Sequence, residues 1–191
     1  QAIASVVAAR TADGPFRDLF EFCRRVDKRL ANRRVVEALV KAGAFDSIDP
    51  RRSTLFASVG VAIEAAEHAE ASAHQVSLFG EGTKETLVPL VTAREWTDAE
   101  RLAHEKTALG FYVSGHPFAA HAAELAPLVK TSLSAIQPRQ ERFLVAGIVT
   151  ALRIQQGKRG KNAFVTLDDG KGTAEITVWN EAFDAARPLL R

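Results

Sequence analysis

The segment Arg142-Phe-Leu-Val-Ala-Gly-Ile-Val-Thr-Ala-Leu-Arg-Ile154 marks a change in the hydrophobic pattern of the chain. Before this segment apolar residues recur at helical spacing, and from it onward they follow the period of two that is typical of strands. We expect a strand over residues 143–154, with a bend or bulge at Gly147. Two shorter strands are expected over residues 163–167 and 173–179. The sequence therefore predicts an α+β chain, with helices first and strands last.

A short helix is predicted after the third strand, over residues 181–190. Three strands followed by a helix is the opening order of a small five-stranded barrel of the oligonucleotide-binding type. The two closing strands of such a barrel would follow Arg191, so we expect a partial barrel with unpaired strand edges. The chain has no methionine and begins at Gln1, and we interpret it as a piece of a longer protein.

The helical part begins with two short helices joined by a tight, basic turn. Apolar residues fall at helical spacing over residues 16–26, where Asp18 and Glu21 form the expected capping pair. Asn32 is a good N-cap for the second helix, which we expect to end at Gly43. The pattern predicts a hairpin of helices.

Two longer helices are predicted after this hairpin. The first begins at Asp49-Pro50, and the second opens with the capping box of Thr97 and Glu100 and ends at Gly110. Between them the periodicity is lost, which indicates a linker. The predicted plan has five parts: a helical hairpin domain (1–48), a helical extension (49–74), a tether (75–96), a helical connector (97–140) and a partial barrel (141–191).

Composition and charge exclude several classes of protein. The 191 residues are 47% hydrophobic, which excludes disorder throughout, and no apolar run approaches the roughly 20 residues of a membrane span. The single cysteine, Cys23, cannot form an internal disulfide and falls inside an apolar stripe, so we expect a core residue in a cytoplasmic protein. The net charge of +2 is uninformative, but basic residues cluster over 24–41 and again over 142–167.

Four stretches, in chain order, carry a family resemblance. They are Phe16 to Asp27 with Asn32 to Asp46, Gln75-Val-Ser-Leu-Phe-Gly80, Glu105-Lys-Thr-Ala-Leu-Gly-Phe-Tyr-Val-Ser-Gly-His-Pro117, and Arg142 to Leu190. In that order they resemble the helix-hairpin-helix domain, the internal sliding-clamp-binding motif, the segment before the oligonucleotide-binding (OB) barrel, and that barrel, in the α subunit of bacterial DNA polymerase III. This α subunit is the replicative DNA polymerase.

The resemblance implies a parent protein that is a DNA-directed DNA polymerase with two metal ions, as Mg²⁺, held by carboxylates. Those catalytic motifs lie upstream of the resembling region, so we assign no catalytic residue, metal ligand or cofactor to this chain. Asp168 and Asp169 form a tight carboxylate pair, but they precede Gly170 and are best explained as turn residues. The implied partners are the β sliding clamp, double- and single-stranded DNA, and other subunits of the replicative holoenzyme, with no membrane.

The clamp-type motif consists of Gln75, Val76, Ser77, Leu78 and Phe79. In an extended segment the Gln75 amide can donate and accept at a pocket rim, while Leu78 and Phe79 supply two apolar anchors. Such a short peptide binds weakly alone, and linkage through shared DNA would supply the rest of the affinity. The alternative is that Leu78 and Phe79 pack on the nearby helices.

Two groups of residues are candidates for DNA contact. Cations of the helical hairpin suit phosphates without sequence readout, although the hairpin lacks the glycine of a phosphate-gripping unit and could chiefly be a packing partner. In the barrel, cations around a hairpin tip lie beside an aromatic ring, as suits single-stranded DNA. Strand alternation predicts that Trp179 is exposed and that Phe164 is a core residue. The candidates are Lys28, Arg29, Arg33 and Arg34 in the hairpin, and Arg153, Lys158, Arg159, Lys161 and Trp179 in the barrel.

Two other functions fit parts of this pattern. One is a non-enzymatic nucleic-acid-binding adaptor that shares the OB barrel, and the other is an error-prone paralogue of the same polymerase. Neither is expected to carry a peptide such as residues 75–79 at this place, so the clamp-type motif favours the replicative polymerase over both.

Overall fold

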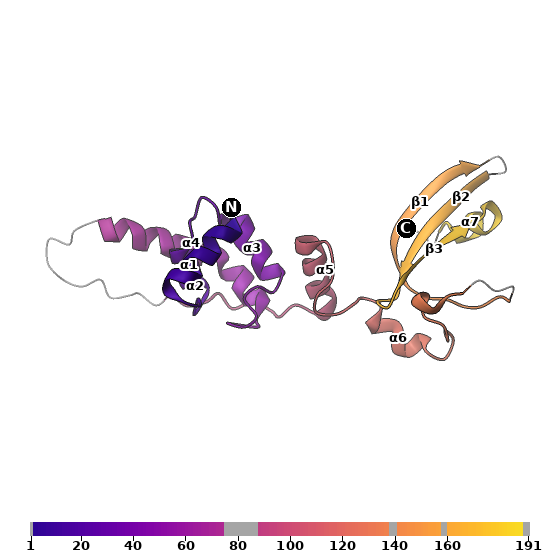
Figure 1. Ribbon diagram of the computed structural model, residues 1–191, viewed down its shortest axis with the longest axis horizontal. Helices are drawn as coiled ribbons and strands as arrows, with labels where there is room; N and C mark the ends of the chain where they lie inside the picture. Colours follow the sequence, from indigo (N-terminus) through magenta and orange to yellow (C-terminus); the bar gives the residue numbers. More distant parts are fainter. Residues whose placement is uncertain (1, 75–87, 138–140, 158–159, 189–191) are drawn as a thin grey trace. The chain divides into compact units, whose positions relative to one another are not determined.

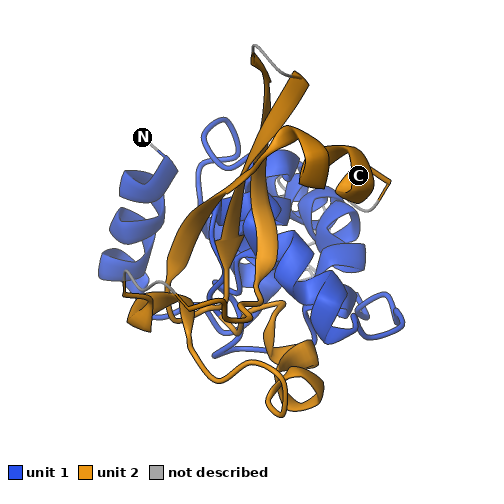
Figure 2. Cartoon of the chain, turned by 90° about the vertical axis from the view of Figure 1, so that its right-hand side faces the viewer, with its two compact units in different colours: residues 1–113 blue, residues 114–191 orange. Residues whose placement is uncertain are grey.

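The chain folds into two compact units, residues 1–113 and 114–191 (Figure 2). The structure is a computed structural model that describes residues 2–74, 88–137, 141–157 and 160–188. Among these described residues, no helix is both long enough and apolar enough to cross a membrane. Unit 1 is helical and unit 2 contains the sheet, which confirms the prediction of helices first and strands last.

The described residues of unit 1 form five helices (Figure 1). The first was not predicted as a helix, because its apolar residues do not form one clear stripe: Val6 and Ala9 pack on the core, whereas Ile3 and Val7 are exposed. The helices are α1 (Ala2–Asp13), α2 (Leu19–Arg25), α3 (Arg33–Lys41), α4 (Arg52–His74) and α5 (Asp98–Leu109).

The predicted caps of α2 and α3 are present. The Asp18 side chain accepts from the Glu21 amide at 2.7 Å, and the Asn32 side chain accepts from the Val35 amide at 3.2 Å. Gly43, two residues after α3, has a φ of 80°, a left-handed conformation that suits glycine. These local hydrogen bonds explain why both helix starts could be read from the sequence.

The capping box predicted for α5 is present, but the predicted start of α4 is two residues early. Thr97 and Glu100 exchange side-chain and backbone hydrogen bonds at the start of α5. The helix α4 begins at Arg52 rather than at Pro50, because Asp49 accepts from the amide of Arg51 at 2.9 Å and forms a turn that holds Pro50 outside the helix.

The core of unit 1 lies where α2 and α3 pack against α4. Phe22 is its centre, with edge-to-face contacts at 5.0 Å between ring centroids to both Phe16 and Phe45. Cys23 is buried here as predicted, and burial raises the pKa of its thiol to about 11. The remaining buried apolar residues of this core are Leu19, Val26, Ala31, Val36, Val40, Leu55, Val59, Ala62 and Ala66.

A buried ion network fastens α5 to the start of α4. Glu105, whose side chain is fully buried, accepts from Arg52 Nη1 at 2.8 Å, and Arg52 Nε donates to Asp46 at 2.7 Å. These two carboxylates raise the pKa of the Arg52 guanidinium. The second oxygen of Glu105 accepts from the Val113 amide at 2.8 Å, so one carboxylate also holds the last residue of unit 1.

Unit 2 contains one antiparallel sheet of three described strands in the order β1-β2-β3, and α7 contacts β2 (Figure 1). The five strands of a complete barrel are therefore not observed among the described residues. The elements are α6 (Ala119–Leu125), the 3₁₀ helix η1 (Leu133–Ala135), β1 (Ile148–Gly157), β2 (Gly160–Asp168), β3 (Thr173–Val178) and α7 (Asn180–Ala186).

The irregularity of β1 lies at a different residue from the predicted one. The pairing register with β2 shifts between Val149 and Ala151, whereas Gly147 precedes the strand. A Cβ at Gly147 would lie 2.9 Å from the backbone oxygen of Asp168, so the glycine permits close approach of two backbones rather than a bulge. The prediction of a bulge at Gly147 is wrong for this reason.

The core of unit 2 covers one face of β2 and leaves β1 open. Every second residue of β2 is buried under η1 and α7: Ala163, Val165 and Leu167, together with Leu133 and Phe183. Ile154, Leu152 and Val149 pair with these three residues and share their face, yet they are 52%, 39% and 48% exposed. The apolar face of the sheet is thus only partly covered within the described residues.

Candidate nucleic-acid interface

The basic turn of unit 1 is closed by its own hydrogen bonds. Asp27 accepts from the amides of Leu30 and Ala31 through its backbone oxygen, and from the Arg29 amide through its side chain at 2.9 Å. These amides are therefore committed within the turn.

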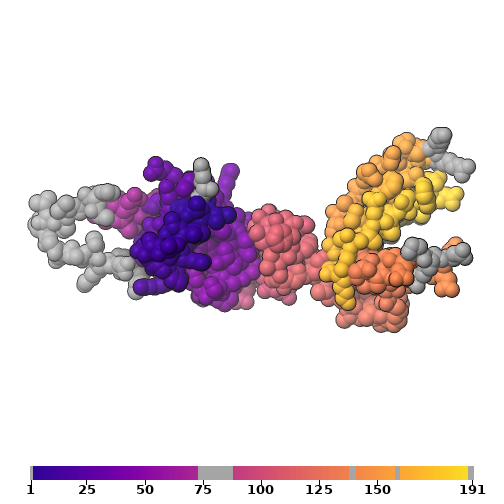
Figure 3. Space-filling model, in the orientation of Figure 1, coloured from indigo at the N-terminus to yellow at the C-terminus, as the bar shows by residue number. Residues whose placement is uncertain are grey.

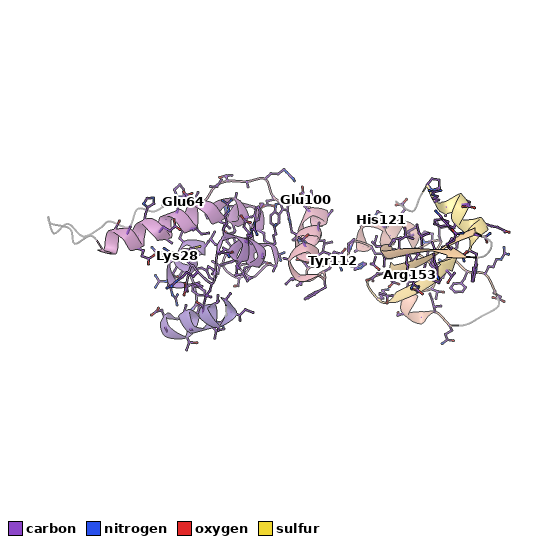
Figure 4. The ribbon with its side chains drawn as sticks, turned by 90° about the horizontal axis from the view of Figure 1, so that it is seen from above. Lys28, Glu64, Glu100, Tyr112, His121 and Arg153 are labelled. Atoms are coloured by element: carbon purple, nitrogen blue, oxygen red, sulfur yellow. The ribbon has the colours of Figure 1, made fainter. Side chains whose placement is uncertain are left out.

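Three of the four predicted hairpin cations pair with a carboxylate, and three of the four are exposed. Lys28 (labelled in Figure 4) lies 2.6 Å from Glu70 of α4, and Arg33 lies 2.8 Å from Glu37 one helical turn on. The Arg29 side chain is 94% exposed, with Asp27 at 3.7 Å, and Arg34 is also exposed. Arg29 and Arg34 are the hairpin cations best placed to meet a phosphate.

In unit 2 a cation and an aromatic ring meet on the face of the sheet opposite the core. Arg153 of β1 (Figure 4) pairs with Phe164 of β2, and its guanidinium carbon lies 4.6 Å from the ring centroid. Phe164 in turn pairs with Thr177 of β3, so these three side chains share one face. We call this the outer face of the sheet.

Phe164 is not a core residue, contrary to the prediction. The buried residues of β2 are the odd-numbered Ala163, Val165 and Leu167, which places Phe164 on the outer face, half-buried. The small and aliphatic residues at 163, 165 and 167 could have revealed this. Position in the alternating pattern of a strand predicts the face on which a side chain lies better than the size of the side chain does.

Trp179 is exposed, as predicted. It lies directly after β3, where it is the N-cap residue of α7, and is 66% exposed. The start of α7 is held to β2 because Asn162 accepts from the Asn180 amide at 2.9 Å. The ring of Trp179 is therefore displayed from a fixed junction between strand and helix.

The remaining predicted cations are Lys158, Arg159 and Lys161, which follow β1 in the sequence. Lys161 of β2 is exposed, and β1 lies at the molecular surface along its length (Figure 3). Lys158 and Arg159 lie outside the described residues, as do Gln75, Val76, Ser77, Leu78 and Phe79 of the clamp-type motif.

Asp168 and Asp169 act as turn and anchoring residues. Asp169 accepts from the amides of Lys171 and Gly172 within the turn, and from the Leu133 amide of η1, each at 2.8 Å. These backbone donors lower the pKa of the Asp169 carboxyl against the effect of burial. Asp168 accepts from the Gly170 amide at 2.8 Å and lies 3.4 Å from His116 Nε2. Across the described parts of the chain, no three His, Cys, Asp or Glu side chains come together as a metal site.

Comparison with known families matches both ends of the chain to nucleic-acid-binding folds. A family profile described as a helix-hairpin-helix motif matches residues 1–55, and one described as an OB-fold nucleic acid binding domain matches residues 143–191. The second match assigns the three-stranded sheet and α7 to an OB-fold domain.

Relatives in several bacteria match nearly the whole chain. DNA polymerase III subunit alpha of Neisseria meningitidis serogroup B is 42% identical over 192 residues, which include all of this chain. The proteins of the same name in Vibrio cholerae and in Escherichia coli K12 are 37% and 34% identical, over 95% and 98% of the chain. The chain is homologous to part of DNA polymerase III subunit alpha. It spans about a sixth of the length of these relatives, 16–17%.

The region that is homologous to DNA polymerase III subunit alpha includes residues of both units. The helix-hairpin-helix match covers α1, α2 and α3, and the OB-fold match covers the sheet with Arg153, Phe164 and Trp179. Both nucleic-acid-binding folds thus occur, in this order, within one region shared with the polymerase subunit.

Proposed function

We propose that this chain binds DNA as part of a bacterial replicative DNA polymerase and supports processive synthesis by also binding the sliding clamp. The observation that carries the proposal is the homology of the whole chain to a part of DNA polymerase III subunit alpha, together with two nucleic-acid-binding folds. Polymerase activity, and the Mg²⁺ it would use, would reside in parts of the relatives outside the matched region. No step of that chemistry is assigned to residues of this chain.

Single-stranded DNA is the ligand that best suits the outer face of unit 2. A strand needs cations for its phosphates and rings for its bases. On this face Arg153 supplies charge, and Phe164 and Trp179 supply a partly buried and an exposed ring. Lys161 adds charge near the β1-β2 turn, on the side of β2 opposite Phe164. No carboxylate of the described residues forms an ion pair with Arg153 or Lys161, so their charge is available to a polyanion.

The test is fluorescence anisotropy with a labelled single-stranded oligonucleotide at several salt concentrations. The affinity should fall steeply with salt, because bound phosphates release counterions. Trp179→Ala should cost about 1–3 kcal/mol of binding free energy, the range found for loss of one stacking ring. Arg153→Ala and Lys158→Ala/Arg159→Ala should weaken binding and flatten the salt slope.

Lys171→Ala is the matched control for these cations. Lys171 is exposed in the turn between β2 and β3, at the other end of the sheet from the β1-β2 hairpin tip. It removes the same charge away from the proposed contact and should leave the affinity within about twofold of the parent. Affinity that does not depend on salt, or equal losses in Lys171→Ala and Arg153→Ala, would refute this placement.

Residues 75–79 are the proposed clamp-binding peptide. The support is their sequence and the homology of the whole chain to the polymerase subunit. Titration with a bacterial sliding clamp should show binding by the parent chain and a loss in Gln75→Ala/Phe79→Ala. The control is Phe111→Ala/Gln137→Ala, which removes the same residue types at two exposed positions. Equal clamp binding by the two double variants would refute the proposal.

We also propose that β1, β2 and β3 belong to a five-stranded OB barrel. The match to the OB-fold profile supports this, and so do the exposed apolar residues Val149, Leu152 and Ile154 on the core side of β1. Two more strands would cover such a face, and a closed barrel has no open sheet edge.

A further inference from the structure

A small cavity of about 200 Å³ lies at the N-terminus of α4, and none of the DNA-binding residues proposed above lines it. Its volume suits a small ion or a single chemical group rather than a whole cofactor. All of its walls belong to unit 1. The residues that matter for its chemistry are Arg51, Arg52, Ser53, Glu95, Trp96 and Arg101.

The helix α4 presents free donors to this cavity. It is 23 residues long, and amides of its first turn have no acceptor within the helix. The Arg52 amide donates to Pro50 and the Leu55 amide donates to Arg51, whereas no acceptor is recorded among the described residues for the amides of Ser53 and Thr54. Such an N-terminus carries a partial positive charge and favours anions.

Two side-chain donors at the cavity also lack partners. Ser53 is only 5% exposed, and its hydroxyl has no hydrogen-bond partner within the described part of the chain. Arg101 Nε is likewise buried without a partner, although Arg101 Nη2 donates to Asp98 at 2.9 Å. A buried donor without an acceptor costs free energy, so two of them beside one cavity point to an acceptor that enters it.

The cations of the cavity are held in position by carboxylates. Asp49 binds Arg51 through two side-chain hydrogen bonds at 3.0 and 2.7 Å, and Arg52 is fixed by Asp46 and Glu105. These carboxylates hold the guanidinium groups in position, but they also offset part of the positive charge. Glu95 is the acidic residue that lines the cavity itself, and it opposes an anion.

We propose that this cavity binds a phosphate group, through the Ser53 hydroxyl, the free amides of the first turn of α4, and Arg101. Hydroxyl, amide and guanidinium donors around a helix N-terminus are the set that recognises phosphate oxygens. The group could be carried by a nucleic-acid backbone or be a free phosphate, and the experiment below separates the two sources. None of these residues is among those proposed for DNA binding, so failure of that proposal leaves this one standing.

The test uses the fluorescence of Trp96, which lines the cavity. The chain has two tryptophans, so Trp179→Phe leaves Trp96 as the single reporter. Inorganic phosphate is titrated into the chain at pH 8, with chloride at matched ionic strength as the reference. At this pH the neighbouring His104, whose pKa is lowered by burial, is uncharged and does not change the signal during the titration.

Four variants give the expected pattern in this background. Ser53→Ala should weaken phosphate binding about two- to tenfold, and Arg101→Gln, which removes a charged donor, at least about tenfold. Glu95→Gln should tighten binding about two- to fivefold, because it removes a repelling charge. Arg94→Gln removes a charge outside the cavity, where Arg94 pairs with Glu100, and should leave the affinity unchanged within about twofold.

The outcomes are distinct. Saturation by phosphate but not chloride, with the variants in this order, supports the site. A response no larger than that of chloride, or equal affinity in the parent, Ser53→Ala and Arg101→Gln chains, overturns it. Arg101 is 40% exposed, so Arg101→Gln tests the site even if Ser53→Ala folds poorly. A short oligonucleotide that changes Trp96 fluorescence and is displaced by phosphate assigns the group to nucleic acid, whereas a response to phosphate alone assigns it to a free phosphate compound.

Discussion

The two units of this chain differ in how they treat their apolar surface and their charges. Unit 1 buries its apolar residues between helices on several sides, and its cations are largely tied to carboxylates, as in Arg25 with Glu21 and Lys28 with Glu70. Unit 2 buries one face of β2, leaves the apolar residues of β1 exposed, and leaves Arg153 and Lys161 without carboxylate partners among the described residues.

The difference indicates a division of work between the units. Many of the charges of unit 1 are paired and its core is covered, so Arg29 and Arg34 are the cations of its hairpin that remain best placed for a polyanion. Arg153 and Lys161, which have no carboxylate partner among the described residues, suit the sheet of unit 2 to a polyanion, while the apolar residues of β1 stay exposed. The predictions below test this contrast, from the largest expected effect to the smallest.

The greatest loss is expected from emptying the centre of the unit 1 core. Phe22→Ala should lower the free energy of unfolding of this unit by about 3–5 kcal/mol, because it leaves a cavity between Phe16 and Phe45. Urea unfolding followed by Trp96 in a Trp179→Phe background reports on unit 1 alone. Phe111→Ala is the control, since Phe111 is 58% exposed and its loss should change stability by about 0.5 kcal/mol or less.

The buried ion network should be the next most sensitive point. Glu105→Gln keeps the size of the side chain but removes the charge that faces Arg52, at an expected cost of about 3 kcal/mol in the same unfolding measurement. Asp98→Asn, on the same helix, removes a carboxylate that is 87% exposed and serves as the comparison. Equal effects of the two changes would mean that the Arg52–Glu105 pair adds nothing to the packing of α5.

A smaller effect should come from pH. Burial lowers the pKa of His104 below its ordinary value of 6.5, and nearby Lys41 acts in the same direction while Glu100 opposes it. The folded state therefore disfavours the proton, so this contribution to unit 1 stability is complete above pH 6.5 and is lost as pH falls through the folded pKa. Between pH 8 and pH 5 the urea midpoint should change less in His104→Gln than in the parent chain. His68→Gln should change as much as the parent, because His68 is exposed.

The smallest change in stability should come from the open face of unit 2. Leu152→Ser/Ile154→Ser alters side chains that are 39% and 52% exposed, at an expected cost of about 1 kcal/mol or less for the pair. Binding of a hydrophobic dye should nevertheless fall, because the exposed apolar face is the surface such a dye occupies. Undiminished dye binding would show that this face is covered in solution.

Local features of the fold were predictable from sequence, whereas contacts between distant segments were not. The caps at Asn32 and Thr97 and the order of the strands follow from neighbouring residues, and the structure confirms them. Burial of Glu105 depends on Arg52, which is 53 positions earlier in the chain, so no local pattern announces it. The position of Phe164 was predicted wrongly, because a large aromatic side chain was expected in the core although the alternation of β2 places it on the opposite face.

Those properties of the candidate site that depend on neighbouring residues could also be predicted from the sequence. Clusters of cations and the exposure of Trp179 are visible in the sequence, since they depend on composition and alternation. Which cations are neutralised is a tertiary property: Lys28 meets Glu70 only because the hairpin packs on α4. The cavity beside Ser53 likewise requires segments from residues 50–53 and 95–101 to come together.

The Arg52–Glu105 pair also bears on the order in which the chain folds. A contact across 53 positions must wait for the closure of a long loop, whereas the capped helices α2 and α3 can form from neighbouring residues. We therefore expect α5 to dock after the transition state. Mutations in this pair should then speed unfolding and leave the folding rate nearly unchanged.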